Sequence, residues 1–571
     1  MLGPFLLAAL ALFATYMYNK LWYKRFQQYA GFTQLPTSLI LGHLKTFDEF
    51  IKRGEADRHP DMIFTEMHEA LGRPPLMLVD LRPVNRPMVL VTNHEIAEQV
   101  SKASKLYPTS APKSDLKYLE HLTGPTSILA SHGDDWKALR KRFNPGFAPQ
   151  HLMTLLPCML DKSSTFIQNL DTLARAGTEF SLVPVIVNLT FDIIGAVVMN
   201  VDLEAQHLDP SRQGELIRLY SELLGAYTDD KADLPWWLIP RTEMKRRRLG
   251  KRIDVLIKEI ICRKHTEQQI QAGGDGKSRS ILSLSLQDTK TLTPELINVT
   301  CDQLKTFLLA GHDTTSTMLA YCFYELSRTP RVLNAVRDEL NRLLGTEDDP
   351  EVVRSRLLSP DGPNLINRMS YISAVIKETL RLHPPAATAR YSKPGTCFTV
   401  HTPVGEDHCL DGVIIYNCES LIHRDRAVYG DTADDFVPER WLTEGPDLSR
   451  NAPTDKPDLN PRTIPASSWR PFERGPRSCI GQEFANIEAR VIIAIVARRY
   501  EFTKVGLGEL ATDEEGRPVL QENDTTGNIQ ACGRDEGKIE VCIQNIINFG
   551  EMWEAAGDKS IARHQGAKDT L

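Results

Sequence analysis

The sequence predicts a mostly α-helical protein with a minor β-sheet region, preceded by a single N-terminal transmembrane helix. Three observations support this fold class. Apolar residues recur with helical spacing over most of the chain, strand-like runs are few and short, and residues 1–18 carry no charge. Hydrophobic residues make up 42% and charged residues 25% of the 571 positions, which is typical of a globular protein.

The predicted helices share apolar residues three or four positions apart. They are 134–143, 149–176, 182–199, 214–227, 243–271, 294–328, 331–344 and 371–382. The segment 294–328 follows Thr293, a favourable N-cap residue, and has Pro294 at its first position. A helix of this length would extend roughly 50 Å. We therefore expect it to cross the whole domain.

The predicted strands are short runs rich in β-branched residues. They are 76–79, 88–91, 397–402, 413–416 and 539–543. The loop-like stretches 273–279 and 445–465 are too short to require a domain boundary. We predict one domain over residues 46–550 and a polar tail over 551–571, which we expect to be flexible.

The N-terminus has the pattern of an uncleaved membrane anchor. Residues 1–18 would reach about 27 Å as a helix, close to the hydrocarbon thickness of a bilayer. Lys20, Lys24 and Arg25 follow at the start of a juxtamembrane linker over residues 19–45. Because this positive charge comes after the apolar run, the positive-inside rule predicts that the rest of the chain lies in the cytosol. A cleaved signal peptide is the alternative.

Cysteine spacing and net charge exclude several classes of protein. The ten cysteines include no Cys-x-x-Cys pair, which argues against a disulfide framework and a zinc ribbon. Most are expected to be small buried side chains. The net charge of −7 provides no positive field for a nucleic acid, so we predict no nucleic-acid partner.

One cysteine lies in a loop whose residue types suit an iron-binding thiolate. Phe472 can pack on the loop and exclude water, and Gly475 and Gly481 would allow tight turns and close approach to a flat ring. Arg477 can form a charge-assisted hydrogen bond to a porphyrin propionate. Amides at the start of the next helix can hydrogen-bond the sulfur of Cys479 and tune its potential.

This loop resembles the haem-binding signature of cytochromes P450, F-x-x-G-x-R-x-C-x-G, at every fixed position. The resemblance implies the cytochrome P450 fold, with Cys479 as the axial ligand of haem b (iron protoporphyrin IX). A buried core cysteine beside an ordinary loop is the alternative reading. As a whole, the sequence resembles the fungal microsomal cytochromes P450 that act in secondary metabolism.

A second match to the family lies in Glu378-x-x-Arg381. These residues are three apart, so they share a helix face and can pair. In the family this pair is completed by an arginine from a Pro-Glu-Arg-Phe element, and Arg440 holds that position here. Trp441 replaces the phenylalanine, a mild departure. The resemblance implies that Glu378, Arg381 and Arg440 form a structural clamp beneath the haem.

A third match, Ala310-Gly311-His-Asp313-Thr314, lies in the middle of the long predicted helix. Thr314 can donate a hydrogen bond to the carbonyl of Ala310 and bend the helix locally. Gly311 removes a side chain where a diatomic ligand would need space. Asp313 and Thr314 offer a carboxylate and a hydroxyl that could deliver protons to bound oxygen. A bent helix with solvated polar residues is the alternative.

Further matches concern the haem propionates and a redox partner. Trp136 and Arg140 fit the family pattern W-x-x-x-R and share a helix face, so both could meet a propionate. Arg390 is a weaker propionate candidate. Lys137 and Lys141 share the neighbouring face, where they would suit an acidic reductase or would simply be solvated.

The resemblance implies a monooxygenase that inserts one atom of O2 into an apolar small-molecule substrate. NADPH-cytochrome P450 reductase would supply electrons from NADPH, with cytochrome b5 as an additional candidate partner. The implied location is the endoplasmic reticulum membrane, single-pass and with the catalytic domain facing the cytosol. A P450-fold isomerase or dehydratase and a non-catalytic thiolate-haem sensor or carrier remain alternatives. The apolar segment at Trp236 and Trp237 could also contact the membrane.

Overall fold

The fold is described by a computed structural model, which covers residues 2–54, 58–114, 116–177, 179–228, 238–270, 280–442, 464–503, 520–522 and 529–531. The chain divides into two compact units, each assembled from separate stretches of sequence. Unit 1 comprises the described parts of Met1–Ser114, Ala386–Asp435 and Ala452–Cys479; unit 2 comprises those of Asp115–Pro385, Phe436–Asn451 and Ile480–Leu571.

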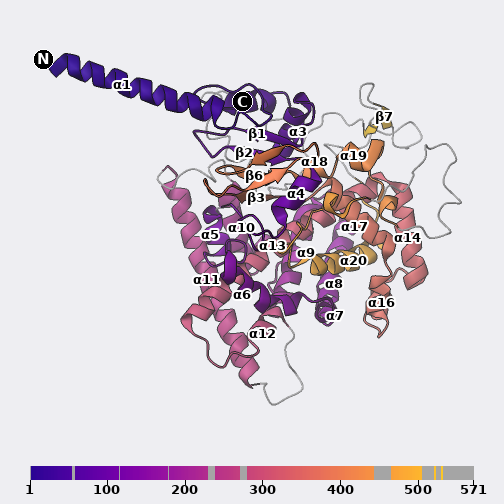
Figure 1. Ribbon diagram of the computed structural model, residues 1–571. Coiled ribbons are helices and arrows are strands. Elements are labelled where there is room, and N and C mark those ends of the chain that lie inside the picture. The colour runs from indigo at the N-terminus through magenta and orange to yellow at the C-terminus, as the bar shows by residue number, and fades with distance from the viewer. Residues whose placement is uncertain are drawn as a thin grey trace, which may run out of the picture. The chain divides into compact units, whose positions relative to one another are not determined.

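Unit 1 contains a small mixed sheet and short helices (Figure 1). Its helices are α1 (Leu2–Trp22), the π-helical η1 (Tyr23–Gln27), α2 (Leu44–Ile51), α3 (Pro60–Ala70), α4 (His94–Ser101), α18 (Glu419–Ile422), α19 (Arg426–Tyr429), and the 3-10 turns η6 (Gly430–Thr432) and η8 (Ala466–Ser468). Its strands are β1 (Leu76–Val79), β2 (Met88–Val91), β3 (Thr388–Tyr391), β4 (Thr399–His401), β5 (Asp407–Cys409) and β6 (Ile414–Asn417).

The main sheet joins strands that are more than 300 positions apart in the sequence. Its order is β1-β2-β6-β3, with β2 and β6 parallel and the outer pairs antiparallel. Every residue of β1, β2 and β6 is buried, which explains why these strands are continuous apolar runs rather than alternating ones. Strands β4 and β5 form a separate antiparallel hairpin.

Unit 2 is built around the long helix α13 (Pro294–Arg328), which contacts α9, α11, α17 and α20. Its other helices are α5 (Glu120–Thr123), α6 (Gly133–Phe143), α7 (Pro149–Met153), α8 (Leu156–Ala176), α9 (Leu182–Met199), α10 (Glu215–Thr228), α11 (Pro240–Ile270), α12 (Ile281–Ser285), α14 (Pro330–Leu344), α15 (Pro350–Leu357), α16 (Gly362–Asn367), α17 (Ser370–Leu382) and α20 (Gln482–Arg499). It also holds the 3-10 turns η2 (Lys117–Leu119), η3 (Asn144–Phe147), η4 (Pro210–Arg212) and η7 (Pro438–Trp441), and the short pair β7 (Leu520–Glu522) and β8 (Ile529–Ala531).

The helices confirm the predicted class and most of the predicted bounds. Helices α9 and α13 begin and end where the sequence predicts, and the Oγ1 of Thr293 accepts the N–H of Leu296 at 3.2 Å as the expected N-cap. The predicted helix 149–176 is wrong as a single helix. It is two helices, because Pro157 has no N–H to donate and occupies the first turn of α8.

The strand predictions were less complete. Strands β1 and β2 have the predicted bounds, but β4 is shorter than predicted because Cys397 has a φ of 59° and donates its N–H to Asp411 instead of to a strand. Strands β3 and β5 were not predicted. The segment 539–543, the tail 551–571 and the pair Trp236–Trp237 lie outside the described residues.

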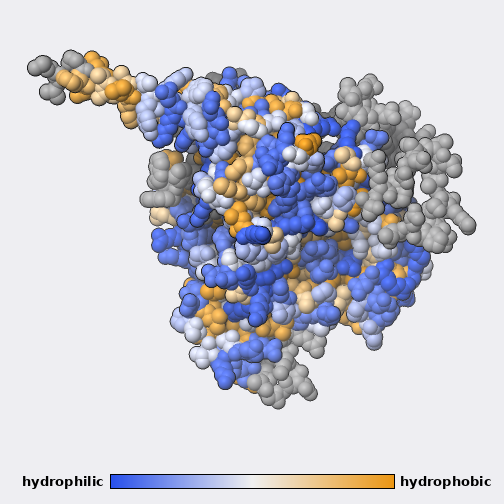
Figure 2. Space-filling view, viewed as in Figure 1, coloured by the Kyte–Doolittle hydropathy of each residue, from blue (hydrophilic) through white to orange (hydrophobic). Residues whose placement is uncertain are grey.

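In the N-terminal helix α1 the side chains of residues 5–20 are exposed, and apolar side chains cover the helix that projects in Figure 2. Among the described residues two helices are long and apolar enough to cross a membrane, Phe5–Gln27 and Leu182–Met199. The second is α9, most of which is buried inside unit 2 against α13. The predicted apolar anchor therefore corresponds to the first.

Candidate active site

The cysteine loop of unit 1 runs from η8 to Cys479 and closes on itself through two backbone hydrogen bonds. The N–H of Cys479 donates to the carbonyl of Phe472 at 2.8 Å, and the N–H of Ser478 donates to that of Gly475 at 3.1 Å. Cys479 is exposed and belongs to no disulfide among the described residues. The loop thus presents its thiol at an accessible position, as an external metal would require.

The two glycines of this loop have different roles. Gly475 has a φ of +76°, and a Cβ there would lie 2.3 Å from the carbonyl oxygen of Ser101, so only glycine fits. This confirms the predicted turn. Gly481 has a φ of −89°, which any residue adopts, so backbone strain does not require glycine there, and its close approach to a flat ring stays a prediction. It is the N-cap residue of α20, which begins at Gln482.

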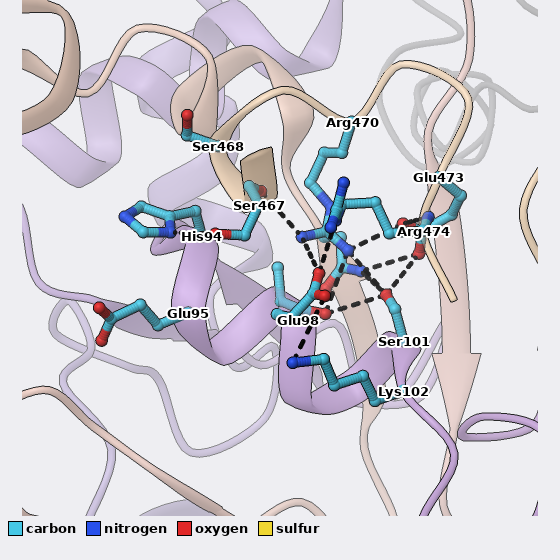
Figure 3. A network of polar contacts seen from close by, with 12 residues as sticks. His94, Glu95, Glu98, Ser101, Lys102, Ser467, Ser468, Arg470, Glu473 and Arg474 are labelled. Atoms are coloured by element: carbon cyan, nitrogen blue, oxygen red, sulfur yellow. Dashed lines mark hydrogen bonds and ion pairs between the residues drawn. The ribbon is translucent and has the colours of Figure 1, made fainter. Parts of the chain in front are cut away.

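Glu473 fixes the loop to the body of unit 1 (Figure 3). Its carboxylate accepts hydrogen bonds from Arg470 at 2.9 Å, from the Ser101 hydroxyl at 2.9 Å and from Asn417 at 3.1 Å. Burial alone would raise the pKa of Glu473, but Arg470 and Arg390 hold it below its ordinary value. A charged carboxylate with this many donors holds the loop in one conformation.

A second ion pair extends the same network. Arg474 donates to Glu98 of α4 at 2.8 Å, and the guanidinium of Arg470 also reaches the hydroxyl of Ser101 at 2.7 Å and the carbonyl of Ala97 at 3.2 Å. Figure 3 shows these side chains converging between α4 and the cysteine loop. The loop is therefore supported on a helix that lies more than 350 positions earlier in the sequence.

Basic side chains cluster around Lys113, which interacts electrostatically with Arg390, Arg477 and the thiol of Cys479. Desolvation, together with the two arginines, lowers the pKa of Lys113 to about 7. Arg390 is fully buried; one terminal nitrogen donates to Ser110 and the other to Glu473, but its Nε has no partner among the described residues. Such a cluster suits an anionic ligand.

These features fit the haem that the sequence predicts. Among the described residues no group of three or more His, Cys, Asp or Glu side chains could hold a metal ion, so Cys479 would be a lone protein ligand. A single thiolate suits a metal that already carries a macrocycle. The cations beside it match the carboxylates of such a ring. The residues of unit 1 therefore fit a thiolate-bound haem.

In unit 2 the side-chain hydrogen bond predicted for the middle of α13 is present. The Thr314 hydroxyl donates to the carbonyl of Ala310 at 2.7 Å, and Ala310 is exposed although Leu308 and Leu309 before it are buried. Desolvation raises the pKa of Asp313 to about 7. A carboxyl group with this pKa can both donate and accept a proton near neutral pH.

The raised pKa of Asp313 has a testable consequence for stability. The native state binds its proton more tightly than the unfolded chain, so stability falls as pH rises from about 4 to 7. We expect Asp313→Asn to raise the free energy of unfolding by roughly 1–3 kcal/mol at pH 8 and to change it little at pH 4, where the unfolded chain is also protonated. Denaturant titrations at both pH values test this; an equal effect at both would contradict it.

Gly311 allows close packing between two helices. A Cβ at this position would lie 2.6 Å from the Cδ1 of Ile194 on α9, so the missing side chain allows two helices to approach. The neighbouring His312 is buried, its Nδ1 lies 2.7 Å from the carbonyl of Leu308, and burial lowers its pKa to about 4. Gly311 therefore has a packing role, and the space that it would leave for a diatomic ligand stays a prediction.

Substitution of Gly311 should reveal this packing. We expect Gly311→Ala to lower the free energy of unfolding by about 1–3 kcal/mol, because the added methyl group overpacks the contact. Ile194→Val removes the nearest atom, so the double variant should lose less than the sum of the two single variants. Gly225→Ala is the control, since a Cβ there meets nothing within 4 Å. Additive losses in urea unfolding would contradict the packing role.

The predicted clamp residues converge in unit 2. Glu378 accepts hydrogen bonds from Arg381 at 2.8 and 2.9 Å and from Arg440 at 3.0 Å. The N–H of Val437 and the indole N–H of Trp441 add bonds of 2.9 and 2.8 Å. Glu378 and Arg381 are fully buried. Trp441, noted as a departure from the family pattern, thus provides a donor that phenylalanine lacks.

The remaining predicted residues lie on α6. Trp136 is buried and Arg140 is half-buried, one turn apart on the same face. Lys137 and Lys141 are exposed, and Lys137 pairs with Asp134 at 3.0 Å. Their roles toward propionates and a reductase stay predictions.

Sequence reasoning missed Lys113, Arg470 and Glu473. Glu473 and Arg470 are three positions apart in the cysteine loop, and this pairing of opposite charges was the available signal. Nothing in the local sequence of Lys113 marks it, because its neighbours Arg390 and Arg477 come from distant segments.

Comparison with known proteins gives one family. Residues 37–525 match the family described as "Cytochrome P450". Cytochrome P450 monooxygenase acrF of Aspergillus aculeatus is 32% identical over 461 residues, which cover 78% of this chain and 88% of that protein. Cytochrome P450 monooxygenase polC of Polytolypa hystricis is 27% identical over 86% of this chain and 85% of its own length.

A third relative combines two activities in its name. The bifunctional cytochrome P450/NADPH–P450 reductase of Gibberella moniliformis is 34% identical over 226 residues, which cover 39% of this chain and 17% of that protein.

Proposed function

Because this chain belongs to the cytochrome P450 family and is a haem-containing monooxygenase, we propose that it inserts one oxygen atom from O2 into an apolar product of fungal secondary metabolism. Haem bound through Cys479 supplies the redox chemistry. The observation that carries this proposal is the accessible thiol of Cys479 on a loop fixed by Glu473, beside a cluster of cations. The two fungal relatives, whose names call them monooxygenases, support the oxygen insertion.

The other site residues hold the cofactor and move protons. Lys113, Arg390 and Arg477 would pair with haem carboxylates, and the sequence pattern proposes the same role for Trp136 and Arg140. Asp313, with its pKa near 7, exchanges a proton with solvent, and the Thr314 hydroxyl passes it toward the oxygen-binding side.

Electrons come from NADPH through a separate reductase. The exposed pair Lys137 and Lys141 provides a positive face for an acidic partner, and cytochrome b5 could use the same face. The Gibberella relative, whose name joins a cytochrome P450 to an NADPH–P450 reductase, supports this choice of electron donor.

The chain is anchored in the endoplasmic reticulum membrane by α1. The exposed apolar side chains of residues 5–18 support this anchoring, and Lys20, Lys24 and Arg25 after them favour a cytosolic location of the catalytic units.

Replacement of Thr314 tests the proposed function. In the full-length holoprotein with reductase and NADPH, we expect Thr314→Ala to retain its haem and to reduce product formation per O2 consumed by about a hundredfold, with peroxide released instead. The control is Thr317→Ala, a buried threonine one turn further along α13. Fully coupled turnover in Thr314→Ala would contradict the proton path. No NADPH consumption by the wild type with any apolar substrate would instead favour a sensor, a carrier or an isomerase.

A further inference from the structure

A buried arginine lies directly after the N-terminal anchor helix. Arg25 belongs to η1, three residues beyond the end of α1, and its side chain is only 2% exposed. Its guanidinium donates to the carboxylate of Asp80 at 2.7 Å, to the carbonyl of Leu39 at 2.9 Å and to that of Arg82 at 2.7 Å. Arginine is almost never this buried unless it is paired.

Asp80 and Arg82 complete what we call the Arg25 clamp, which consists of Arg25, Asp80 and Arg82. Arg82 donates to Asp80 through two nitrogens, each at 2.8 Å. The same guanidinium reaches back to η1 and its flank, to the carbonyl of Lys24 at 2.6 Å and the amide oxygen of Gln28 at 3.0 Å. The segment after α1 is therefore held to unit 1 by hydrogen bonds in both directions.

The backbone around the clamp is shaped to fit it. Gly42 has a φ of +58°, and a Cβ there would lie 2.5 Å from the carbonyl oxygen of Asp80 and 2.6 Å from a terminal nitrogen of Arg25. His43 fixes Asp80 further by accepting its N–H at 2.7 Å. Burial would raise the pKa of Asp80, but Arg82 and Arg25 lower it, so the clamp is a charged network at neutral pH.

No flexible connection separates the clamp from the anchor. Helix α1 ends at Trp22 and η1 begins at Tyr23, and the N–H of Gln28 donates to the carbonyl of Tyr23 at 2.9 Å. The helical backbone thus continues from the apolar segment to Arg25. The direction in which α1 leaves unit 1 is set by the clamp.

Exposed apolar side chains surround the clamp on unit 1. Tyr23 is 57% exposed, Ile40 68%, Leu41 45% and Val84 52%. Ile40 offers its carbonyl to Arg25, and Val84 lies two residues after Arg82, so these side chains form a rim where the anchor leaves the unit. A rim of this kind, continuous with a membrane helix, suits the interfacial layer of a bilayer.

We propose that the Arg25 clamp locks the anchor helix to unit 1, so that the protein sits on a lipid bilayer in one orientation with Tyr23, Ile40, Leu41 and Val84 resting in the interfacial layer. This proposal rests on the proposed anchoring by α1. The bilayer is the chosen partner because the rim adjoins the apolar helix, whose side chains have no other cover among the described residues of unit 1.

Linear dichroism of the haem tests the lock in the full-length holoprotein in oriented phosphatidylcholine bilayers. The wild type should give a strong dichroic signal, because one orientation gives one haem tilt. Arg25→Met should lose most of this signal while retaining its haem, since Asp80 keeps Arg82 as a partner and no buried carboxylate is left unpaired. Lys24→Met is the matched control, with the same loss of charge on an exposed neighbouring side chain.

Two further variants keep the test decisive. A flexible Gly-Ser-Gly-Ser insertion between Asn19 and Lys20 leaves the clamp intact and should abolish the dichroism as Arg25→Met does. Ile40→Glu combined with Val84→Glu should change the mean haem tilt, whereas Val404→Glu, at a 77% exposed position of the same unit, should not. Undiminished dichroism in both Arg25→Met and the insertion variant would overturn the lock, and so would an equal loss in Lys24→Met.

Membrane pelleting separates this proposal from the proposed anchoring. Wild-type protein that stays with phosphatidylcholine vesicles through an alkaline wash supports the anchor. If it pellets but shows no dichroism, the lock fails and the anchor stands. If the wild-type protein is removed by the wash, the proposed anchoring is refuted, and the proposed lock is refuted with it.

Discussion

Cys479→Ala is expected to abolish the carbon-monoxide band from which the family takes its name, together with all monooxygenase activity. The thiolate is the predicted bond between chain and iron, and no cluster of other ligating side chains among the described residues could replace it. Because the loop is held by Glu473 and Arg470 rather than by the cysteine side chain, the apoprotein should remain folded. The measurement is the reduced carbon-monoxide difference spectrum, with circular dichroism reporting the fold.

Cys409→Ala is the matched control for this experiment. Cys409 is also exposed and also lies in unit 1, on strand β5. Its replacement should leave the spectrum and the turnover of the wild type unchanged. A normal carbon-monoxide band in Cys479→Ala would refute the assignment of the axial ligand. Loss of the band in Cys409→Ala would show that the effect is not specific to Cys479.

Glu378→Gln should be the most destabilising single substitution in unit 2. The carboxylate accepts five hydrogen bonds in a fully buried position, three of them from Arg381 and Arg440. A neutral amide removes the negative charge that Glu378 provides to Arg381 and Arg440, and the loss of one partner of a buried ion pair destabilises a protein by about 3–5 kcal/mol. We expect this loss in urea unfolding followed by circular dichroism, with poor haem retention at physiological temperature.

The control for Glu378→Gln is Glu347→Gln, a change of the same chemistry at an exposed position of the same unit. Surface substitutions of this kind change stability by at most about 0.5 kcal/mol. Arg440→Lys should give an intermediate loss, because lysine keeps the charge but not the planar guanidinium. Equal stability of Glu378→Gln and Glu347→Gln would contradict the structural role of the clamp.

The sequence located the chemistry of this protein because its signals are local. The spacing around Cys479 lies within ten residues, and the bond from Thr314 to Ala310 spans one helical turn. Glu378 and Arg381 likewise need only helix geometry to pair. Each of these could be read from residue type and spacing alone.

The long-range contacts that support these residues could not be predicted from the sequence in the same way. Ser101 meets Glu473 across 372 positions, and no periodicity predicts such a contact. Strand β3 was missed because it is held by pairing with β6 rather than by a strong local pattern. The packing role of Gly311 was missed, since the atom that excludes a side chain belongs to Ile194 on another helix.

The sequence by itself determined the thiolate, the acid–alcohol pair, the bounds of the long helices and the apolar anchor. Only the tertiary structure decided what holds the cysteine loop, why Gly311 is a glycine and how Arg25 ties the anchor to Asp80. The physical reason is the distance along the sequence over which each kind of interaction acts. Propensity, capping and spacing act within a few residues, whereas buried ion pairs and close helix contacts depend on which distant segments the core brings together.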